Sequence, residues 1–146
     1  MANKQLDMVI RMARERRDEA AQRLADGQAA VRAAQEQVQQ LTQYQQMYLE
    51  QNQTASMQGI SVQNLAQARQ FIGELSNLIN AQGNVVADRE REVEALAEVW
   101  REASRYQQAV EKLAELRQSE ATAVLEKREQ QQLDDLFSQR MGYLKD

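Results

Sequence analysis

The sequence contains no cysteine and no histidine, so it lacks the residues that form disulfides and most zinc sites. The Ser–His and Cys–His pairs of nucleophilic catalysis are excluded for the same reason. No P-loop, glycine-rich dinucleotide loop or acidic metal loop occurs. The carboxylates alternate with arginines at helix-surface spacing, which is typical of solvated ion pairs. We therefore predict no catalytic residue, no metal site, no cofactor and no enzymatic activity.

Proline is absent as well, and only five glycines occur in 146 residues. A compact β or α/β fold of this length normally needs more turn-forming residues. Ala, Glu, Gln, Arg and Leu, which all favour helices, dominate the composition instead. With two Phe, one Trp and four Tyr, the chain has few large side chains for a thick core. We therefore predict an all-α protein of long helices, in a single domain over residues 1–146.

Long hydrophobic runs are also missing, and none approaches the ~20 apolar residues that a membrane-spanning helix needs. The first residues lead into charged positions without the apolar region of a signal peptide. A net charge of −4 argues against general nucleic-acid binding. We therefore expect a cytoplasmic protein with no transmembrane segment and no nucleic-acid partner.

An apolar seam with alternating three- and four-residue spacing runs through the first part of the chain. One series of this seam consists of Ile10, Arg17, Leu24, Val31, Val38 and Gln45. The other series is mostly small, which lets two helices approach closely, and consists of Leu6, Ala13, Ala20, Gly27, Ala34, Leu41 and Tyr48. The pattern predicts a helix over about residues 3–52, in which the Arg17 stem packs while its charged head reaches solvent.

A cluster of turn-forming residues at 53–60 interrupts the helical pattern and has no apolar periodicity. Within it, Gly59 is able to adopt a positive φ. Ser61 is a good N-cap for a following helix. We therefore expect the first helix to end near Asn52 and the second to begin near Ser61.

The seam resumes after the bend and predicts a second helix over about residues 61–143. It holds one register for nearly seven heptads, through Leu65, Ala68, Ile72, Leu75, Ile79, Gln82, Val86, Arg89, Val93, Leu96, Trp100, Ala103, Gln107 and Val110. At ~1.5 Å per residue the second helix is the longer, so an antiparallel pairing brings the start of the chain near Glu111. The predicted fold is therefore a long antiparallel two-helix coiled-coil hairpin with a C-terminal helical overhang of about 30 residues.

Charge is distributed unevenly along this hairpin. Only six charged residues, counting Asp26 itself, occur from Asp26 to Val86, where the polar surface is mostly Gln and Asn. The bend end is thus neutral, whereas arginines gather near the start of the chain. Tyr44 and Phe71 each flank the seam in the neutral region, and exposed aromatics on such a surface are common anchors of protein interfaces.

An ordered set of motifs resembles the FliJ family, which are cytoplasmic components of the bacterial flagellar type III export apparatus. The set comprises Tyr44-x-x-x-Tyr48, the turn ending at Gly59, Gln70-Phe71-Ile72 and Trp100-Arg101-Glu102. The resemblance spans most of the chain. It implies an antiparallel two-helix coiled coil, similar to the central stalk of rotary ATPases.

The resemblance also implies three kinds of partner: the ring of the export ATPase, the cytoplasmic domain of the export gate, and export chaperones. It implies a peripheral location at the inner-membrane export apparatus. The family's gate-contact face corresponds here to Gln37, Leu41, Tyr44, Tyr48, Phe71, Leu75, Leu78 and Gln82. The last two replace the Ala and His of many relatives, which puts a titratable role at Gln82 in doubt.

Clustered basic residues at the open end provide a second candidate surface. We hypothesise that it faces the ATPase and consists of Arg11, Arg14, Arg16, Arg17, Lys127, Arg128 and Arg140. Alternative functions are a general export chaperone and a purely structural coiled-coil adaptor, including one that dimerises through its overhang. The sequence does not separate a flagellar component from its injectisome counterpart.

Overall fold

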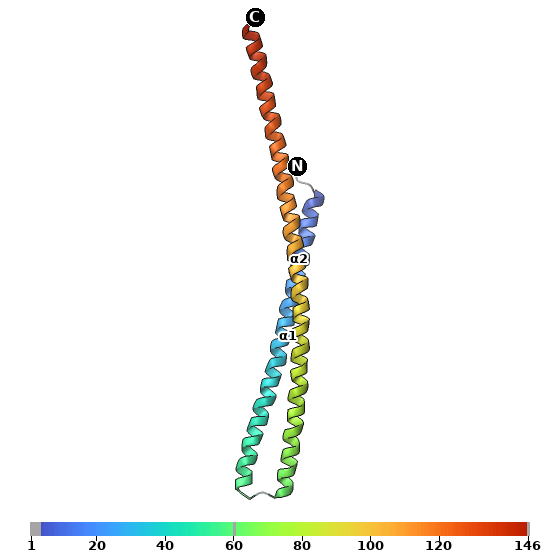
Figure 1. The fold of residues 1–146 in the computed structure, drawn as a ribbon, viewed down its shortest axis with the longest axis vertical. Helices are drawn as coiled ribbons and strands as arrows, with labels where there is room; N and C mark the ends of the chain where they lie inside the picture. The colour runs from blue at the N-terminus through green and yellow to red at the C-terminus, as the bar shows by residue number, and fades with distance from the viewer. Residues whose placement is uncertain (1–3, 60, 146) are drawn as a thin grey trace. The chain divides into compact units, whose positions relative to one another are not determined.

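The computed structural model describes residues 4–59 and 61–145, with side chains up to Gly142, and contains two helices (Figure 1). Helix α1 spans Lys4–Met57 and helix α2 spans Val62–Lys145. No strand occurs among these residues, so the all-α prediction is confirmed. The predicted limits Asn3 and Ile60 lie outside the described residues.

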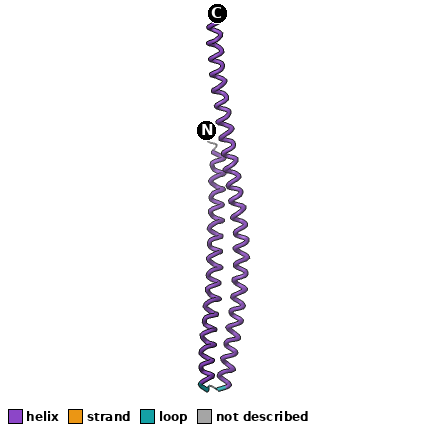
Figure 2. Tube along the Cα trace, turned by 60° about the vertical axis from the view of Figure 1, so that its left-hand side comes forward, coloured by secondary structure: helices purple, strands orange, loops and turns teal. Residues whose placement is uncertain are grey.

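The contacts of the chain divide it into two units, which are described separately below. The hairpin unit is Asp18–Arg101, and the terminal unit combines Met1–Arg17 with Glu102–Asp146. In the hairpin unit, α1 and α2 lie side by side and run in opposite directions, as Figures 1 and 2 both show. This arrangement confirms the predicted helical hairpin. The assignment of the whole chain to one domain stays a prediction.

The bend is shorter than the sequence indicated, because α1 continues five residues beyond Asn52. The polar residues that suggested a turn are accommodated in the helix: the Thr54 hydroxyl donates to the Glu50 carbonyl at 3.1 Å. The backbone amide of Gln58 donates to the Thr54 carbonyl at 3.2 Å, which extends the helical hydrogen bonding to the end of α1. The predicted helix end near Asn52 and the bend at 53–60 are therefore wrong, because neither glycine nor proline occurs between Asn52 and Gly59.

Two residues of the bend behave as predicted. Gly59 has a φ of 83°, the left-handed conformation that commonly ends a helix. Ser61 caps α2, since its hydroxyl accepts a hydrogen bond from the Asn64 amide at 3.4 Å. The carbonyl of Ser61 also accepts the first hydrogen bond of the helix, from the Leu65 amide at 3.2 Å.

The core of the hairpin unit is built largely from alanine, and its buried residues include Ala20, Ala34, Ala68 and Leu75. The helices approach so closely at Gly27 that an added Cβ would lie 2.8 Å from Leu96 Cδ1. Small residues in one seam position therefore permit this packing, as their spacing predicted.

The predicted seam of α2 fails at two positions. Arg89 is exposed and forms an ion pair with Glu92, and Trp100 also lies at the surface. The register is otherwise kept, because Ala103, Gln107 and Val110 of the same series are buried farther along α2. The two misplaced side chains are therefore local exceptions, and Arg89 reaches the exposed Glu92 on its own helix.

The terminal unit places the first segment of α1, residues 4–17, beside the first part of its α2 segment (Figure 2). Ala13, Ala103 and Val110 are buried between them. Every described side chain from Glu115 to Gly142 is exposed. The predicted C-terminal helical overhang is thus present in this unit.

Candidate partner-binding sites

Three aromatic side chains of the hairpin unit form one cluster across the two helices. The rings of Tyr48 and Phe71 meet edge to face with centroids 4.8 Å apart, and those of Tyr44 and Phe71 with centroids 6.4 Å apart. Such edge-to-face pairs contribute about 0.5–1.5 kcal/mol beyond the area they bury. Phe71 therefore joins α2 to α1, and we call these three residues the aromatic cluster.

Exposure divides the aromatic cluster and its neighbours into two groups. Tyr44 and Leu78 are 51% and 54% exposed, so both present large apolar surfaces to solvent. Phe71 and Tyr48 are half-buried, and Leu75 lies in the core at 4% exposure. Phe71 is therefore less open than the sequence indicated, because the two tyrosines lie against its ring.

Two glutamines link the helices farther from the bend. The side-chain amide of Gln82 donates to the side-chain oxygen of Gln37 at 2.6 Å. Both glutamines belong to the predicted gate-contact face. Together with the aromatic cluster, this bond brings five of the eight predicted residues into direct contact across the hairpin. Leu41, half-buried on α1, and the buried Leu75 lie in the seam, and Leu78 is exposed on α2.

Sequence reasoning missed Met47, which is 57% exposed on α1. Met47 follows Tyr44 by three residues, so the two side chains share one face of the helix. A flexible thioether beside an exposed aromatic ring suits an adaptable binding surface. The i, i+3 spacing from Tyr44 was the signal that could have found it.

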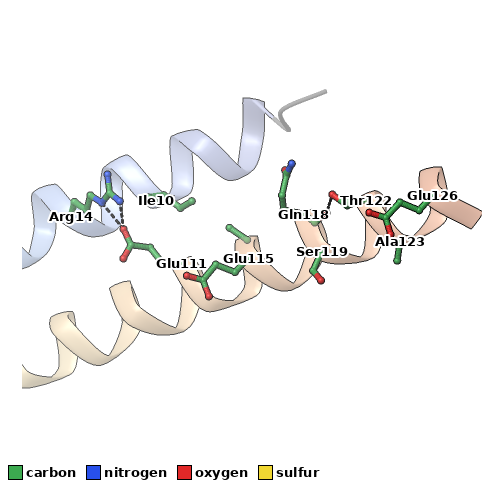
Figure 3. Close-up of a pocket in the computed structure, with 10 residues that line it drawn as sticks. Ile10, Arg14, Glu111, Glu115, Gln118, Ser119, Thr122, Ala123 and Glu126 are labelled. Carbon is green, nitrogen blue, oxygen red and sulfur yellow. Dashed lines mark hydrogen bonds and ion pairs between the residues drawn. The ribbon is translucent and has the colours of Figure 1, made fainter.

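The predicted basic surface is divided in the terminal unit, because two of its arginines contact α2. Arg14 forms an ion pair with Glu111, drawn in Figure 3. The guanidinium of Arg17 donates to the Gln107 side-chain oxygen at 2.7 Å, so its head is not directed only to solvent as expected. The Gln107 amide in turn donates to Glu111 at 2.7 Å, which completes a polar network of four side chains.

Burial makes this polar network structurally important, since Gln107 is only 7% exposed. A buried amide without hydrogen bonds costs about 1–3 kcal/mol, and here both its oxygen and its nitrogen are engaged. The network therefore favours one alignment of residues 4–17 on α2. The network is not visible in the sequence, because a glutamine at a seam position resembles those on the surface.

The remaining basic residues do not gather on one face. Arg11 and Arg16 are exposed, and at ~100° per residue they lie about 140° apart around α1. Lys127, Arg128 and Arg140 are exposed on the overhang of α2. On α1, Arg11 and Arg16 are therefore the two basic residues of the set that are exposed and take no part in the polar network. Their removal leaves that network intact.

An open hollow of about 810 Å³ lies in the terminal unit where α1 begins and α2 continues (Figure 3). Apolar Ile10 and Ala114 share its lining with charged groups that include Arg14, Glu115 and Glu126. Within the described residues no group of three or more acidic side chains is placed to hold a metal ion. The hollow is therefore an open groove lined by both apolar and charged side chains.

Neither helix, over its described residues, is long and apolar enough to cross a membrane. Among known protein families, the one described as Flagellar FliJ protein matches residues 2–143. No curated protein and no solved structure matches the chain.

Proposed function

The chain belongs to the FliJ family of flagellar proteins and is thus a component related to flagellar export, and we propose that it couples the export ATPase to the export gate. In this proposal the chain is a non-enzymatic stalk that binds the ATPase ring and the cytoplasmic domain of the gate. It acts in the cytoplasm, at the periphery of the inner-membrane export apparatus, and escorts export chaperones.

The observation that carries the proposal is the exposure of three large apolar side chains near the bend: Tyr44, Met47 and Leu78. All three lie in the charge-poor part of the sequence, where desolvation on binding is inexpensive. Tyr is enriched among the residues that dominate interface energies. Phe71 supports Tyr44 from the opposite helix through their edge contact, which gives the surface a fixed shape.

The charge and the form of the terminal unit favour an interaction with the ATPase ring. Residues 4–17 and their α2 segment are aligned by the polar network of Arg14, Arg17, Gln107 and Glu111. Arg11 and Arg16 remain exposed beside this alignment and are available to acidic groups of another protein. A fixed helical pair with exposed cations suits insertion into a ring.

The experiment that tests this function compares two binding reactions of the purified chain. Co-purification with the export ATPase, with ring assembly scored by electron microscopy, measures the first. Calorimetry with the isolated gate domain measures the second. We expect Tyr44→Ala to abolish detectable gate binding and leave ring assembly intact. Loss of both reactions, or of neither, would contradict separate binding sites and favour a general export chaperone.

A further inference from the structure

The overhang of α2 presents large apolar side chains that have no neighbour on α1. Leu133, Leu136 and Phe137 are 66%, 59% and 66% exposed. They belong to the terminal unit. Figure 3 shows Ile10 and Arg14 of α1 beside an earlier part of α2, so the described contacts of residues 4–17 with α2 precede Leu133 in the chain. Exposed apolar side chains of this size, gathered within five residues, indicate an interaction surface.

A heptad pattern runs along this surface in its own register. Glu126, Glu129, Leu133, Leu136 and Arg140 follow one another at spacings of three, four, three and four residues. This alternation is the pattern of a coiled-coil seam, with two leucines at its centre and charges at either side. The seam begins at the hollow near Ile10, because Glu126 belongs to the lining of that hollow as well.

The charges of this seam lack opposite charges within their own helix. Elsewhere on α2, arginines pair with carboxylates three residues away, as in Arg89–Glu92 and Arg101–Glu98. Neither Glu129 nor Arg140 has an opposite charge three or four residues away in the sequence. Along the helix they are about 16 Å apart, which is too far for a direct ion pair between them.

We propose that a second copy of this chain covers the overhang in an antiparallel orientation. When Leu133 lies opposite Leu136 of the second copy, Glu129 lies opposite its Arg140. The two-fold symmetry repeats both pairs, so Glu129 and Arg140 of each copy are compensated by the other copy. A parallel alignment would instead place Glu129 against Glu129 and Arg140 against Arg140, which is unfavourable.

The positions that border the proposed seam are compatible with this pairing. They carry no charge and consist of Leu125, Gln130, Gln132, Phe137 and Gln139. Asp134 and Asp135 point away from the seam by their place in the heptad, so their like charges do not oppose one another closely. Phe137 adds apolar area beside the central leucines.

The overlap is short, so we expect a weak and reversible dimer. Sedimentation equilibrium of the full chain, with no other protein present, measures this association. In Glu129→Arg, the new arginine lies opposite Arg140 of the second copy. In Arg140→Glu, the new glutamate lies opposite Glu129 of the second copy. Each single variant is expected to weaken self-association by about tenfold or more.

A mixture of the two variants provides the decisive measurement. Glu129→Arg and Arg140→Glu are complementary in an antiparallel heterodimer, so mixing them should restore association. Matched controls change the net charge equally on the outer face: Asp135→Arg for the first variant and Lys127→Glu for the second. Both controls should associate like the original chain, and circular dichroism should show equal helix content for all variants.

Three outcomes would overturn the proposal: an original chain that stays monomeric at millimolar concentration, single variants that associate normally, and a mixture that stays monomeric. The last outcome would indicate a parallel dimer or a different partner for the overhang. Because the measurement contains neither the export ATPase nor the gate, its failure leaves the proposed export function unaffected.

Discussion

Arg14 of α1 forms an ion pair with Glu111 of α2, although 97 residues separate them in the chain. The pair continues through Gln107 to Arg17, so a polar network aligns the start of the chain on the second helix. An apolar seam of alanines tolerates sliding, whereas a buried amide with two fixed partners does not. The network therefore selects the alignment of residues 4–17.

Gln107→Ala should loosen the segment 4–17 selectively. The substitution leaves Arg17 and Glu111 without their shared partner, at a cost of about 1–3 kcal/mol. Hydrogen exchange of the amides in residues 4–17 should accelerate by about fivefold or more, while the hairpin unit keeps its protection. Gln108→Ala is the matched control, because Gln108 is exposed. Equal acceleration in both variants would show that the network does not hold the segment.

Glycines at two places in the hairpin unit should respond differently to alanine. At Gly73 an added Cβ has no atom within 4 Å, so Gly73→Ala should stabilise the protein by up to ~1 kcal/mol through helix propensity. At Gly27 the new Cβ would lie 2.8 Å from Leu96 Cδ1 and 3.3 Å from Val93 Cγ2. Those side chains must shift, so Gly27→Ala should lose this gain or destabilise the fold.

Urea unfolding followed by circular dichroism measures both free energies of unfolding. The comparison is internal, since the same chemical change is made in the same unit. An equal gain in stability at Gly27 and Gly73 would mean that the helices do not approach closely at Gly27. Gly27→Val extends the series, and overpacking of this kind typically costs about 1–3 kcal/mol.

Much of the fold is predictable from the sequence because heptad spacing and composition act locally. The two helices, the cap at Ser61 and the positive φ of Gly59 all follow from residues within a few positions of each feature. The end of α1 was not predictable in this way. Asn, Thr and Ser near residue 54 are compatible with both helix and turn, and the hydrogen bonds that decided the outcome are not visible in composition.

The candidate sites were predictable only in part, because they depend on which residues of the two helices lie opposite one another. The resemblance to a family supplied the region of Tyr44 and Phe71, and the structure adds their edge contact and unequal exposure. The basic surface was inferred from clustering along the chain. Clustering does not reveal that Arg14 and Arg17 turn toward Glu111 and Gln107.

Tyr44→Ala and Phe71→Ala should differ in their effect on stability while both impair gate binding. Tyr44 is half exposed, so its removal should lower the melting temperature only slightly. Phe71 is half-buried against both tyrosines, so Phe71→Ala should cost stability, but less than the ~3–5 kcal/mol of a fully buried Phe. Calorimetry should show at least about thirtyfold weaker gate binding for each.

A matched control for this pair is Met57→Ala, because Met57 is exposed near the bend and lies outside the aromatic cluster. It should affect neither stability nor gate binding. Should Phe71→Ala lose stability while its folded fraction still binds the gate normally, the aromatic cluster would be a clamp for the bend and not an interface.

Charge reversal at Arg11 and Arg16 should separate the ATPase interaction from folding. Both side chains are exposed, and exposed charges contribute only ~0–1 kcal/mol to stability, so Arg11→Glu with Arg16→Glu should unfold at nearly the original urea concentration. Stimulation of the export ATPase should fall, and the residual stimulation should depend less on salt, because screening acts on the lost attraction. Arg23→Glu is the control, since Arg23 is exposed but pairs with Glu19 within its own helix. If the double variant stimulates the ATPase like the original chain at every salt concentration, then these arginines do not face the ring.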